Sequence, residues 1–181
     1  MIIQFCGLSG SGKTTLANNA KYLLAQQNIS VEVIDGDEYR KVLCADLGFS
    51  KKDRNENIRR LAFVASRLAE YKVIPIICAI NPYENIRQEI SVSYNNVKTV
   101  FIDCGLEVLQ QRDTKGLYKK AMLPDGHADK ITNLTGVNDP FENPAHADLE
   151  LHTDAETIDA STKKLVSFIL QHYRMINAAL V

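Results

Sequence analysis

Short apolar runs alternate along this chain with longer segments whose apolar residues recur at helical spacing. The apolar runs are rich in Val, Ile and Cys and lack strict alternation with polar residues, which predicts strands covered on both faces. The predicted strands are Ile2–Cys6, Val31–Asp35, Val73–Ile80, Val97–Asp103 and Leu149–His152. The predicted helices between them are Thr14–Gln27, Asp37–Leu43, Asp53–Tyr71, Tyr83–Tyr94 and Leu106–Gln111. This alternation is typical of βαβ units and predicts an α/β fold with a central, mainly parallel sheet and helices on both faces.

Two predicted helices begin with recognisable capping residues. Asn81-Pro82 combines an N-cap side chain with a proline at the first helical position. Thr153-Asp154-Ala155-Glu156 resembles a capping box, which predicts a long helix that begins there and continues to about Tyr173. The tail Met175–Val181 is apolar enough to pack either against a neighbouring copy or against the protein's own core.

Residues Arg112 to Pro144 differ from the rest of the chain because they carry charges, glycines and prolines without a clear period. Elsewhere the 181 residues contain no linker, repeat or low-complexity segment, so we interpret residues 1–181 as one domain. A weakly patterned segment of this length inside a compact domain is usually functional. We therefore predict a lid at approximately residues 112–144, which closes over a bound ligand and excludes water.

Composition and charge argue against several classes of partner. The formal net charge is −1, so nothing indicates non-specific attraction to nucleic acid or to an anionic membrane. The longest apolar stretch, Val73–Ile80, is too short to span a bilayer. Met1 leads directly into the first predicted strand and leaves no room for a signal or transit peptide. These features predict a cytoplasmic protein with no nucleic-acid and no membrane partner.

The cysteines and histidines do not have the spacing of a structural metal site. No two of the four cysteines form a C-x-x-C pair, and the four histidines lack zinc-ligand spacing. Cys6, Cys78 and Cys104 lie in or beside predicted strands, which favours reduced, partly buried thiols.

The first predicted strand is followed by Gly7-Leu8-Ser9-Gly10-Ser11-Gly12-Lys13-Thr14, which matches the pattern G-x-x-x-x-G-K-[ST]. This loop lies between a strand and a helix, where its backbone N–H groups and the helix dipole can hold phosphates. We expect Lys13 to reach the β- and γ-phosphates of ATP or GTP and the Thr14 hydroxyl to ligate Mg²⁺. The predicted nucleotide-binding residues are Gly7, Ser9, Gly10, Ser11, Gly12, Lys13, Thr14 and Thr15.

A pair of carboxylates, Asp35 and Asp37, follows the second predicted strand. In a doubly wound sheet, ligands bind outside the carboxyl ends of the strands, so both carboxylates are expected to face the phosphates. One of them can hold the Mg²⁺ shell, for which Asp35 is the candidate, and the other can accept a proton from an attacking hydroxyl.

Three further blocks are less generic than these two motifs. They are the string from Leu47 to Arg60, the string Arg112-Asp113-Thr114-Lys115-Gly116-Leu117-Tyr118, and the string from Leu134 to Glu142 with the sequence LTGVNDPFE. Together with the phosphate loop, these blocks resemble the adenylyl-sulfate kinase family. The resemblance extends from Gly7 to about Pro144 and therefore covers most of the chain.

The resemblance implies a P-loop kinase with the three-layer P-loop NTPase fold, which uses ATP and Mg²⁺ to phosphorylate the ribose 3′-hydroxyl of adenylyl sulfate. Asp37 is then the base or metal organiser, and Phe49 stacks on the acceptor base. Lys115 begins the lid sequence and, with Lys119 or Lys120, closes on phosphate charge. The residues that match acceptor-binding positions of the family are Arg40, Phe49, Arg54, Asn57, Ile80, Asn81, Lys120 and Leu134. The resemblance also makes a homodimer the expected assembly.

The chain departs from the family pattern at three places near the acceptor. The family usually has I-S-P-Y-R where this chain has Ile80-Asn81-Pro82-Tyr83-Glu84, and a second stacking aromatic where this chain has Leu134. The segment Met122–Lys130 is also longer than usual. A lost aromatic face is worth about 1–3 kcal/mol. The acceptor is therefore adenylyl sulfate or a sibling 5′-modified nucleotide, such as the cytidine diphosphoramidate of capsule pathways.

Two different classes compete with a kinase. A GTPase switch needs an aspartate in its N/T-K-x-D guanine sequence, and Thr114-Lys115-Gly116-Leu117 lacks it. A non-catalytic nucleotide-binding partner of another enzyme would not need Lys13, Thr14, Asp35 and Asp37 together, because each of these residues serves the transfer step.

Overall fold

A computed structural model describes residues 1–178 of the chain, which form five strands and seven helices. The strands are β1 (Ile2–Cys6), β2 (Val31–Asp35), β3 (Ile74–Cys78), β4 (Val97–Asp103) and β5 (Leu149–His152). They form one sheet in the order β2-β3-β1-β4-β5, and every neighbouring pair is parallel. The predicted parallel α/β sheet is therefore confirmed, with β3 shorter at both ends than the apolar run around it.

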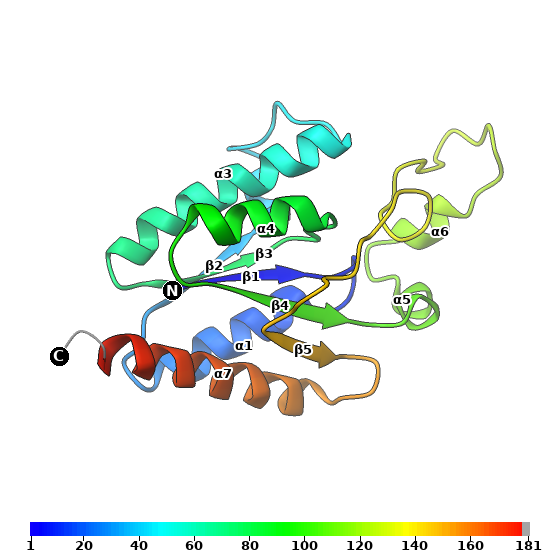
Figure 1. The fold of residues 1–181 in the computed structure, drawn as a ribbon. Coiled ribbons are helices and arrows are strands. Elements are labelled where there is room, and N and C mark those ends of the chain that lie inside the picture. Colours follow the sequence, from blue (N-terminus) through cyan, green and yellow to red (C-terminus); the bar gives the residue numbers. More distant parts are fainter. Residues whose placement is uncertain (179–181) are drawn as a thin grey trace.

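Helices cover both faces of the sheet, as Figure 1 shows. Helices α1 (Lys13–Ala25) and α7 (Ile158–Ala178) lie on one face, and α3 (Lys51–Glu70) and α4 (Glu84–Ser93) lie on the other. One apolar core joins Phe5 to α1 and α7, and a second joins Ile34 to α3 and α4. Because both faces are covered, the strands need no continuous polar side, which explains why β3 is apolar throughout and why β1 carries only Gln4 as a polar residue.

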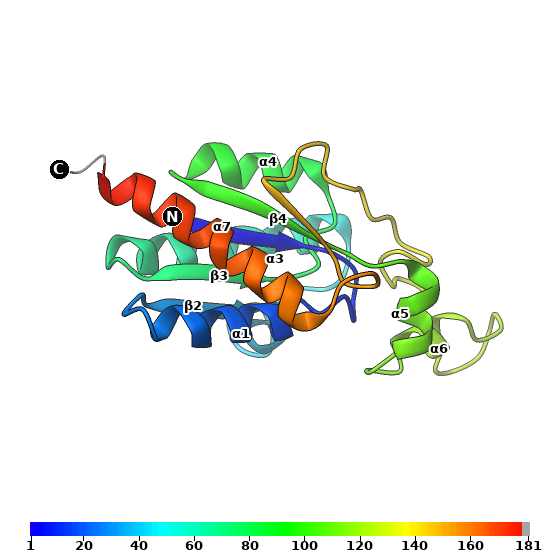
Figure 2. The same cartoon turned by 90° about the horizontal axis from the view of Figure 1, so that it is seen from below.

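All strands end at the same edge of the sheet, and the connections that carry polar residues gather there. The loop after β1 leads to α1, and β2 leads to the short helix α2 (Gly36–Arg40). After β4, the helices α5 (Leu106–Arg112) and α6 (Leu117–Ala121) project beyond the sheet, as Figures 1 and 2 show from two sides.

The long C-terminal helix begins later than its predicted capping box. The Thr153 hydroxyl donates to the Ser11 carbonyl over 2.9 Å and to the Asp103 carbonyl over 3.1 Å. Helix α7 instead begins at Ile158, and the Thr157 hydroxyl accepts a hydrogen bond from the N–H of Ala160 over 3.2 Å. The capping-box prediction was wrong because the N–H groups of Ala155 and Glu156 both donate to the His152 carbonyl, which closes a turn that ends before α7 begins.

The predicted N-cap at Asn81 was also wrong. Helix α4 begins at Glu84 after Tyr83, and Asn81 has a left-handed backbone with a φ of 47°. Its Nδ2 donates to Gln4 Oε1 over 3.2 Å, so a strand in the centre of the sheet binds the side chain. By contrast, α3 has a side-chain cap, because the Ser50 hydroxyl accepts from the N–H of Asp53 over 3.2 Å.

The segment predicted as a lid contains helix α6, which its sequence did not predict, and it shares a small apolar core, here called the lid core, with the end of β4 and with α5. The buried members of this core are Cys104, Leu109, Tyr118, Ala121 and Leu134. The Tyr118 hydroxyl donates to the Ser9 carbonyl over 2.7 Å and ties the segment to the phosphate loop.

The C-terminal tail continues α7 to Ala178, and residues 179–181, which belong to the predicted apolar tail, lie outside the described residues. None of the helices within residues 1–178 is long and apolar enough to cross a membrane. All four cysteines are free and buried, as expected for Cys6, Cys78 and Cys104 from their positions in or beside strands.

Candidate active site

The phosphate loop connects β1 to α1 with a backbone that suits glycine. Gly12 precedes the helix in a left-handed conformation with a φ of 95°, which a side chain would strain. The Lys13 ammonium donates to the carbonyls of Gly7 over 2.9 Å and Leu8 over 2.7 Å. Burial lowers the pKa of Lys13 to about 8, because the charged form loses water. The lysine is therefore held over the loop in the place where phosphate oxygens can replace carbonyls as its partners.

Thr14 and Asp35 meet beside this loop. The Thr14 hydroxyl donates to Asp35 Oδ2 over 2.8 Å, and Asp35 Oδ1 accepts from the N–H of Asp37 over 2.9 Å. Asp35 thus caps α2, which fixes its carboxylate toward the loop. A hydroxyl and a carboxylate suit Mg²⁺, which prefers oxygen ligands and usually keeps waters and substrate phosphates in its shell. Within residues 1–178 no group of three His, Cys, Asp or Glu side chains could hold a metal by itself.

A cavity of about 240 Å³ lies over the loop. Its walls come from the phosphate loop, the ends of β2 and β3, and the start of the lid segment. The lining residues are Ser9, Gly10, Gly12, Lys13, Thr14, Thr15, Asp35, Asp37, Cys78, Ala79, Ile80, Thr114 and Lys115. Most of the predicted nucleotide-binding residues therefore share one cavity.

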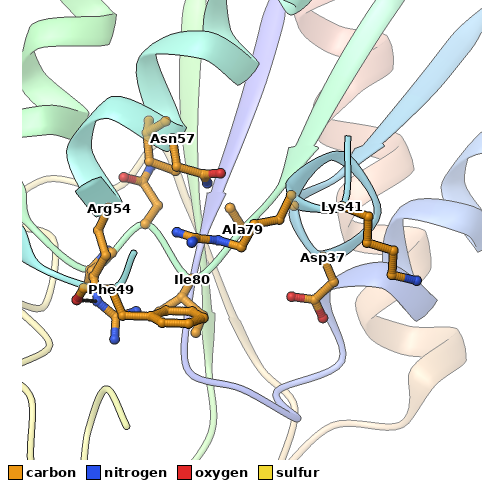
Figure 3. A pocket seen from close by; sticks show the side chains of 12 residues that line it. Asp37, Lys41, Phe49, Arg54, Asn57, Ala79 and Ile80 are labelled. Carbon is orange, nitrogen blue, oxygen red and sulfur yellow. Dashed lines mark hydrogen bonds between the residues drawn. The ribbon is translucent and has the colours of Figure 1, made fainter. Parts of the chain in front are cut away.

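A second cavity of about 300 Å³ lies between α2, the start of α3 and the loop after β3. In Figure 3, Phe49 and Arg54 lie on one side of it and Asp37 lies on the other. The lining residues are Gly36, Asp37, Arg40, Lys41, Phe49, Arg54, Asn57, Ile58, Ala79, Ile80, Asn81 and Pro82. The two cavities share Asp37, Ala79 and Ile80 and therefore meet at the Asp37 carboxylate.

Two arginines flank the exposed ring of Phe49 in the second cavity. The Arg40 guanidinium lies 4.5 Å from the ring centroid and that of Arg54 lies 5.5 Å from it. Phe49 is 52% exposed, so a planar ligand can reach its ring. An aromatic face between guanidinium groups suits a base that carries anionic groups.

Asp37 pairs with a residue of the lid segment. The Lys115 ammonium donates a hydrogen bond to Asp37 Oδ2. Both side chains are mostly exposed, so the ion pair adds little to stability and can be exchanged for a ligand.

Three residues singled out near the acceptor lie away from both cavities. Leu134 is buried in the lid core beside Tyr118, and Lys120 is exposed on α6. Glu84 turns away to the buried Arg87, whose Nη2 donates to Glu84 Oε2 over 2.6 Å. An apolar Leu134 gains more from the lid core than from an open polar cavity, which explains its placement.

Several lining residues were missed by the sequence reading. Ala79 follows β3, and the rule that ligands bind beyond strand ends could have found it. Lys41 carried no signal apart from its place beside Arg40. A third cavity of about 360 Å³, between the phosphate loop and α7, is lined in part by Arg112 and Thr153 and had no sequence signal either.

The sequence of this chain matches a known protein family. The model of the adenylylsulphate kinase family matches residues 1–152. This chain belongs to the adenylyl-sulfate kinase family. The adenylyl-sulfate kinase of Rippkaea orientalis is 43% identical over 163 residues, which are 90% of this chain and 87% of the relative. That of Chloroflexus aurantiacus is 45% identical over 154 residues, which are 85% of this chain and 80% of the relative.

The fold is likewise that of solved members of the adenylyl-sulfate kinase family. The APS kinase CysC of Mycobacterium tuberculosis, solved in complex with AMPPNP and APS, superposes with a TM-score of 0.85 at 37% identity. The match covers 93% of this chain and 96% of that chain. The shikimate kinase of Aquifex aeolicus, at 18% identity and a TM-score of 0.51, shares the fold alone. The family resemblance and the P-loop fold predicted from the sequence are confirmed.

Proposed function

We propose that this protein transfers the γ-phosphoryl group of ATP to the ribose 3′-hydroxyl of adenylyl sulfate. The observation that carries the proposal is that a phosphate-loop cavity and an arginine-lined cavity meet at Asp37. ATP in the first cavity directs its γ-phosphate toward Asp37, and the acceptor in the second directs its hydroxyl to the same carboxylate. Relatives at 43% and 45% identity that bear the name adenylyl-sulfate kinase support this choice.

The transfer step follows from the residues at the junction. The acceptor 3′-oxygen bonds to the γ-phosphorus while the bond between that phosphorus and the β,γ-bridging oxygen breaks. Asp37 accepts the hydroxyl proton, and the products are 3′-phosphoadenylyl sulfate and ADP. Lys13 and Lys115 supply positive charge to the transferring group, which stabilises the negative charge of the transition state. Arg40 and Arg54 hold the anionic end of the acceptor.

Mg²⁺ is part of this proposal because Thr14 and Asp35 offer suitable oxygen ligands side by side. When bound with ATP, the ion neutralises charge on the β- and γ-phosphates. Thr14 and Asp35 would hold it, and Asp35 keeps its orientation through the backbone N–H of Asp37.

Two residues that differ from the family pattern, Glu84 and Leu134, lie outside the acceptor cavity, which favours adenylyl sulfate over a sibling nucleotide. The Glu84 carboxylate binds Arg87 and does not line the acceptor cavity. Leu134 belongs to the lid core and is also absent from that lining. Only Asn81 changes the cavity wall, and its side chain binds Gln4 of β1. The charge and aromatic changes therefore leave the acceptor cavity unaltered.

Three other expectations remain part of the proposal: one domain with a lid at about residues 112–144, a cytoplasmic location, and assembly as a homodimer. The small lid core around Tyr118 and its contact with Ser9 support a lid segment that touches the phosphate loop.

Steady-state ADP release with a panel of acceptors tests the function. The panel contains adenylyl sulfate and cytidine, uridine and guanosine diphosphate derivatives, including cytidine diphosphoramidate. We expect kcat/KM to be highest for adenylyl sulfate, with ADP release dependent on the acceptor. A preference for a pyrimidine compound would contradict the proposed acceptor while leaving the kinase chemistry intact. Equal ADP release without any acceptor would contradict transfer to a hydroxyl altogether.

A further inference from the structure

We propose that Asp139, in the segment LTGVNDPFE, is a positioning residue that holds Arg54 in the orientation needed to bind the acceptor. This inference rests on the proposed function and deepens it, because it assigns a role to a carboxylate that lines neither of the two cavities that meet at Asp37. Asp139 acts through Arg54 and does not itself line the acceptor cavity.

Two of the three guanidinium nitrogens of Arg54 are held by contacts within the protein. Its Nε donates to the Phe49 carbonyl over 3.0 Å and lies 3.4 Å from Asp139 Oδ2. Its Nη2 donates to the Asn133 carbonyl over 2.6 Å. Within residues 1–178 the third nitrogen, Nη1, has no hydrogen-bond partner, while the residue lines the acceptor cavity. The contacts therefore leave the N–H groups of Nη1 for a ligand.

Asp139 is itself held in place by two hydroxyls. Its Oδ2 accepts from the Tyr83 hydroxyl over 3.2 Å and from the Thr135 hydroxyl over 3.3 Å. The backbone closes around it, because the Gly136 N–H donates to the Asp139 carbonyl over 2.7 Å. Tyr83 follows β3, whereas Thr135 belongs to the segment after α6, so the carboxylate joins the loop that lines the acceptor cavity to the segment after α6.

The ion pair between Asp139 and Arg54 is largely shielded from water, which strengthens the hold of the carboxylate on the guanidinium. The Arg54 side chain is 9% exposed and that of Asp139 is 21% exposed, so water screens their attraction only in part. Asp139 is the one carboxylate within ion-pair distance of Arg54 among the described residues. Without it, the nearly buried cation loses its compensating charge and can turn toward Asp37, a carboxylate that lines the same cavity. Arg54 does not line the ATP cavity, so the loss of Asp139 should not change the binding of ATP.

The test compares Asp139→Asn with the matched control Asp148→Asn. Asp148 is also a partly buried carboxylate bound by a cation and a donor, since it accepts from Lys98 Nζ over 2.9 Å and from the Thr99 N–H over 2.8 Å. It lies outside both cavities. We expect Asp139→Asn to raise the acceptor KM by about 10- to 100-fold, as for a lost buried charge-assisted contact. The ATP KM should change less than about 3-fold by the same reasoning, and Asp148→Asn should change neither.

A double-mutant cycle separates positioning from general damage to the fold. In an Arg54→Ala background, Asp139→Asn should cause no further rise in the acceptor KM, because the group it orients is gone. Tyr83→Phe keeps the buried ring and removes one hydroxyl from Asp139, so we expect a smaller rise in the acceptor KM with an unchanged ATP KM. This variant provides the test if Asp139→Asn folds poorly.

Equal effects of Asp139→Asn on the KM of acceptor and ATP, or full additivity with Arg54→Ala, would overturn the positioning role. Every variant is measured with adenylyl sulfate and with the acceptor that the wild-type protein prefers in the panel. If the wild type rejects adenylyl sulfate, the proposed function fails, while the comparison of variants with the preferred acceptor still decides the role of Asp139.

Discussion

The ammonium of Lys115, at the start of the lid segment, pairs with the carboxylate of Asp37, at the junction of the two cavities. The two residues come from different segments that line the ATP cavity, and both remain largely exposed. Phosphate oxygens are stronger partners for the lysine than one exposed carboxylate. Binding of ATP should therefore draw Lys115 to the phosphates and free Asp37 to receive the proton of the acceptor hydroxyl.

Asp37→Asn is the most direct variant of the proposed base. The amide keeps the size of the side chain but cannot accept the hydroxyl proton, so we expect kcat to fall by at least about 100-fold. ATP affinity should change little, because Lys13 and the loop backbone make the phosphate contacts. Initial rates and ATP binding by calorimetry check both statements. Near-normal turnover would remove Asp37 from the mechanism.

Phe49→Ala tests the stacking platform of the acceptor cavity. Loss of a stacked aromatic face costs about 1–3 kcal/mol, so the acceptor KM should rise about 5- to 150-fold. Phe63→Ala is the control, because Phe63 is also more than half exposed but lines neither cavity. The two KM values of each variant are measured side by side. Equal increases for ATP and acceptor in Phe49→Ala would contradict a stacking role.

The lowered pKa of Lys13 predicts proton uptake on ATP binding. Burial holds this pKa at about 8 in the free protein, and bound phosphates raise it because they stabilise the charged form. Above pH 8 the free protein carries a neutral lysine, so ATP binding takes up a proton and weakens as the pH rises. Well below pH 8 the lysine is already charged and takes up no proton.

Calorimetry at pH 8.5, in two buffers with different ionisation enthalpies, measures this proton uptake. Lys13→Met removes the titrating group and should abolish the difference between buffers. The same uptake in the variant, or none in the wild type, would contradict the assignment.

Glu84→Arg restores the residue type that the family usually has, but its expected effect is on stability. Arg87 is 2% exposed and bonds Glu84 Oε2 through Nη2 over 2.6 Å and Nε over 3.0 Å. A second cation there leaves a buried charge without compensation, which should cost about 1–3 kcal/mol. Glu89→Arg, which breaks a more exposed pair with Arg59, should cost about 1 kcal/mol or less.

Denaturant unfolding and the acceptor panel check the Glu84 prediction together. The variant should unfold more easily and keep its acceptor preference. A changed acceptor preference at unchanged stability would mean that Glu84 acts on the cavity and not on Arg87.

The features that the sequence predicted well depend on neighbours along the chain. The buried strands appear as apolar runs, and the phosphate loop appears as fixed glycines before Lys13. Because parallel strands end at one edge, the rule for strand ends also predicted that Asp35 and Asp37 lie beside the phosphate loop. These predictions needed no knowledge of distant contacts.

The features that the sequence missed depend on residues far away in the chain. Thr153 was predicted to cap the last helix, but it lies in a turn before that helix, and its hydroxyl donates to the Ser11 carbonyl of the phosphate loop. Leu134 looked like a wall of the acceptor cavity, yet the lid core around Tyr118 buries it. Arg54 was found as an acceptor residue, whereas its contact with Asp139 has no local pattern to reveal it. Tertiary packing decides each of these cases.

The most direct test of the account is to identify the phosphorylated product. The protein is incubated with ATP, Mg²⁺ and adenylyl sulfate, and the nucleotide products are followed by phosphorus NMR and mass spectrometry. The account predicts one ADP for each new phosphomonoester, with that phosphorus coupled to the ribose H3′ proton of an intact phosphosulfate. Release of inorganic phosphate without a new ester, or phosphate at any other position of the acceptor, would contradict it.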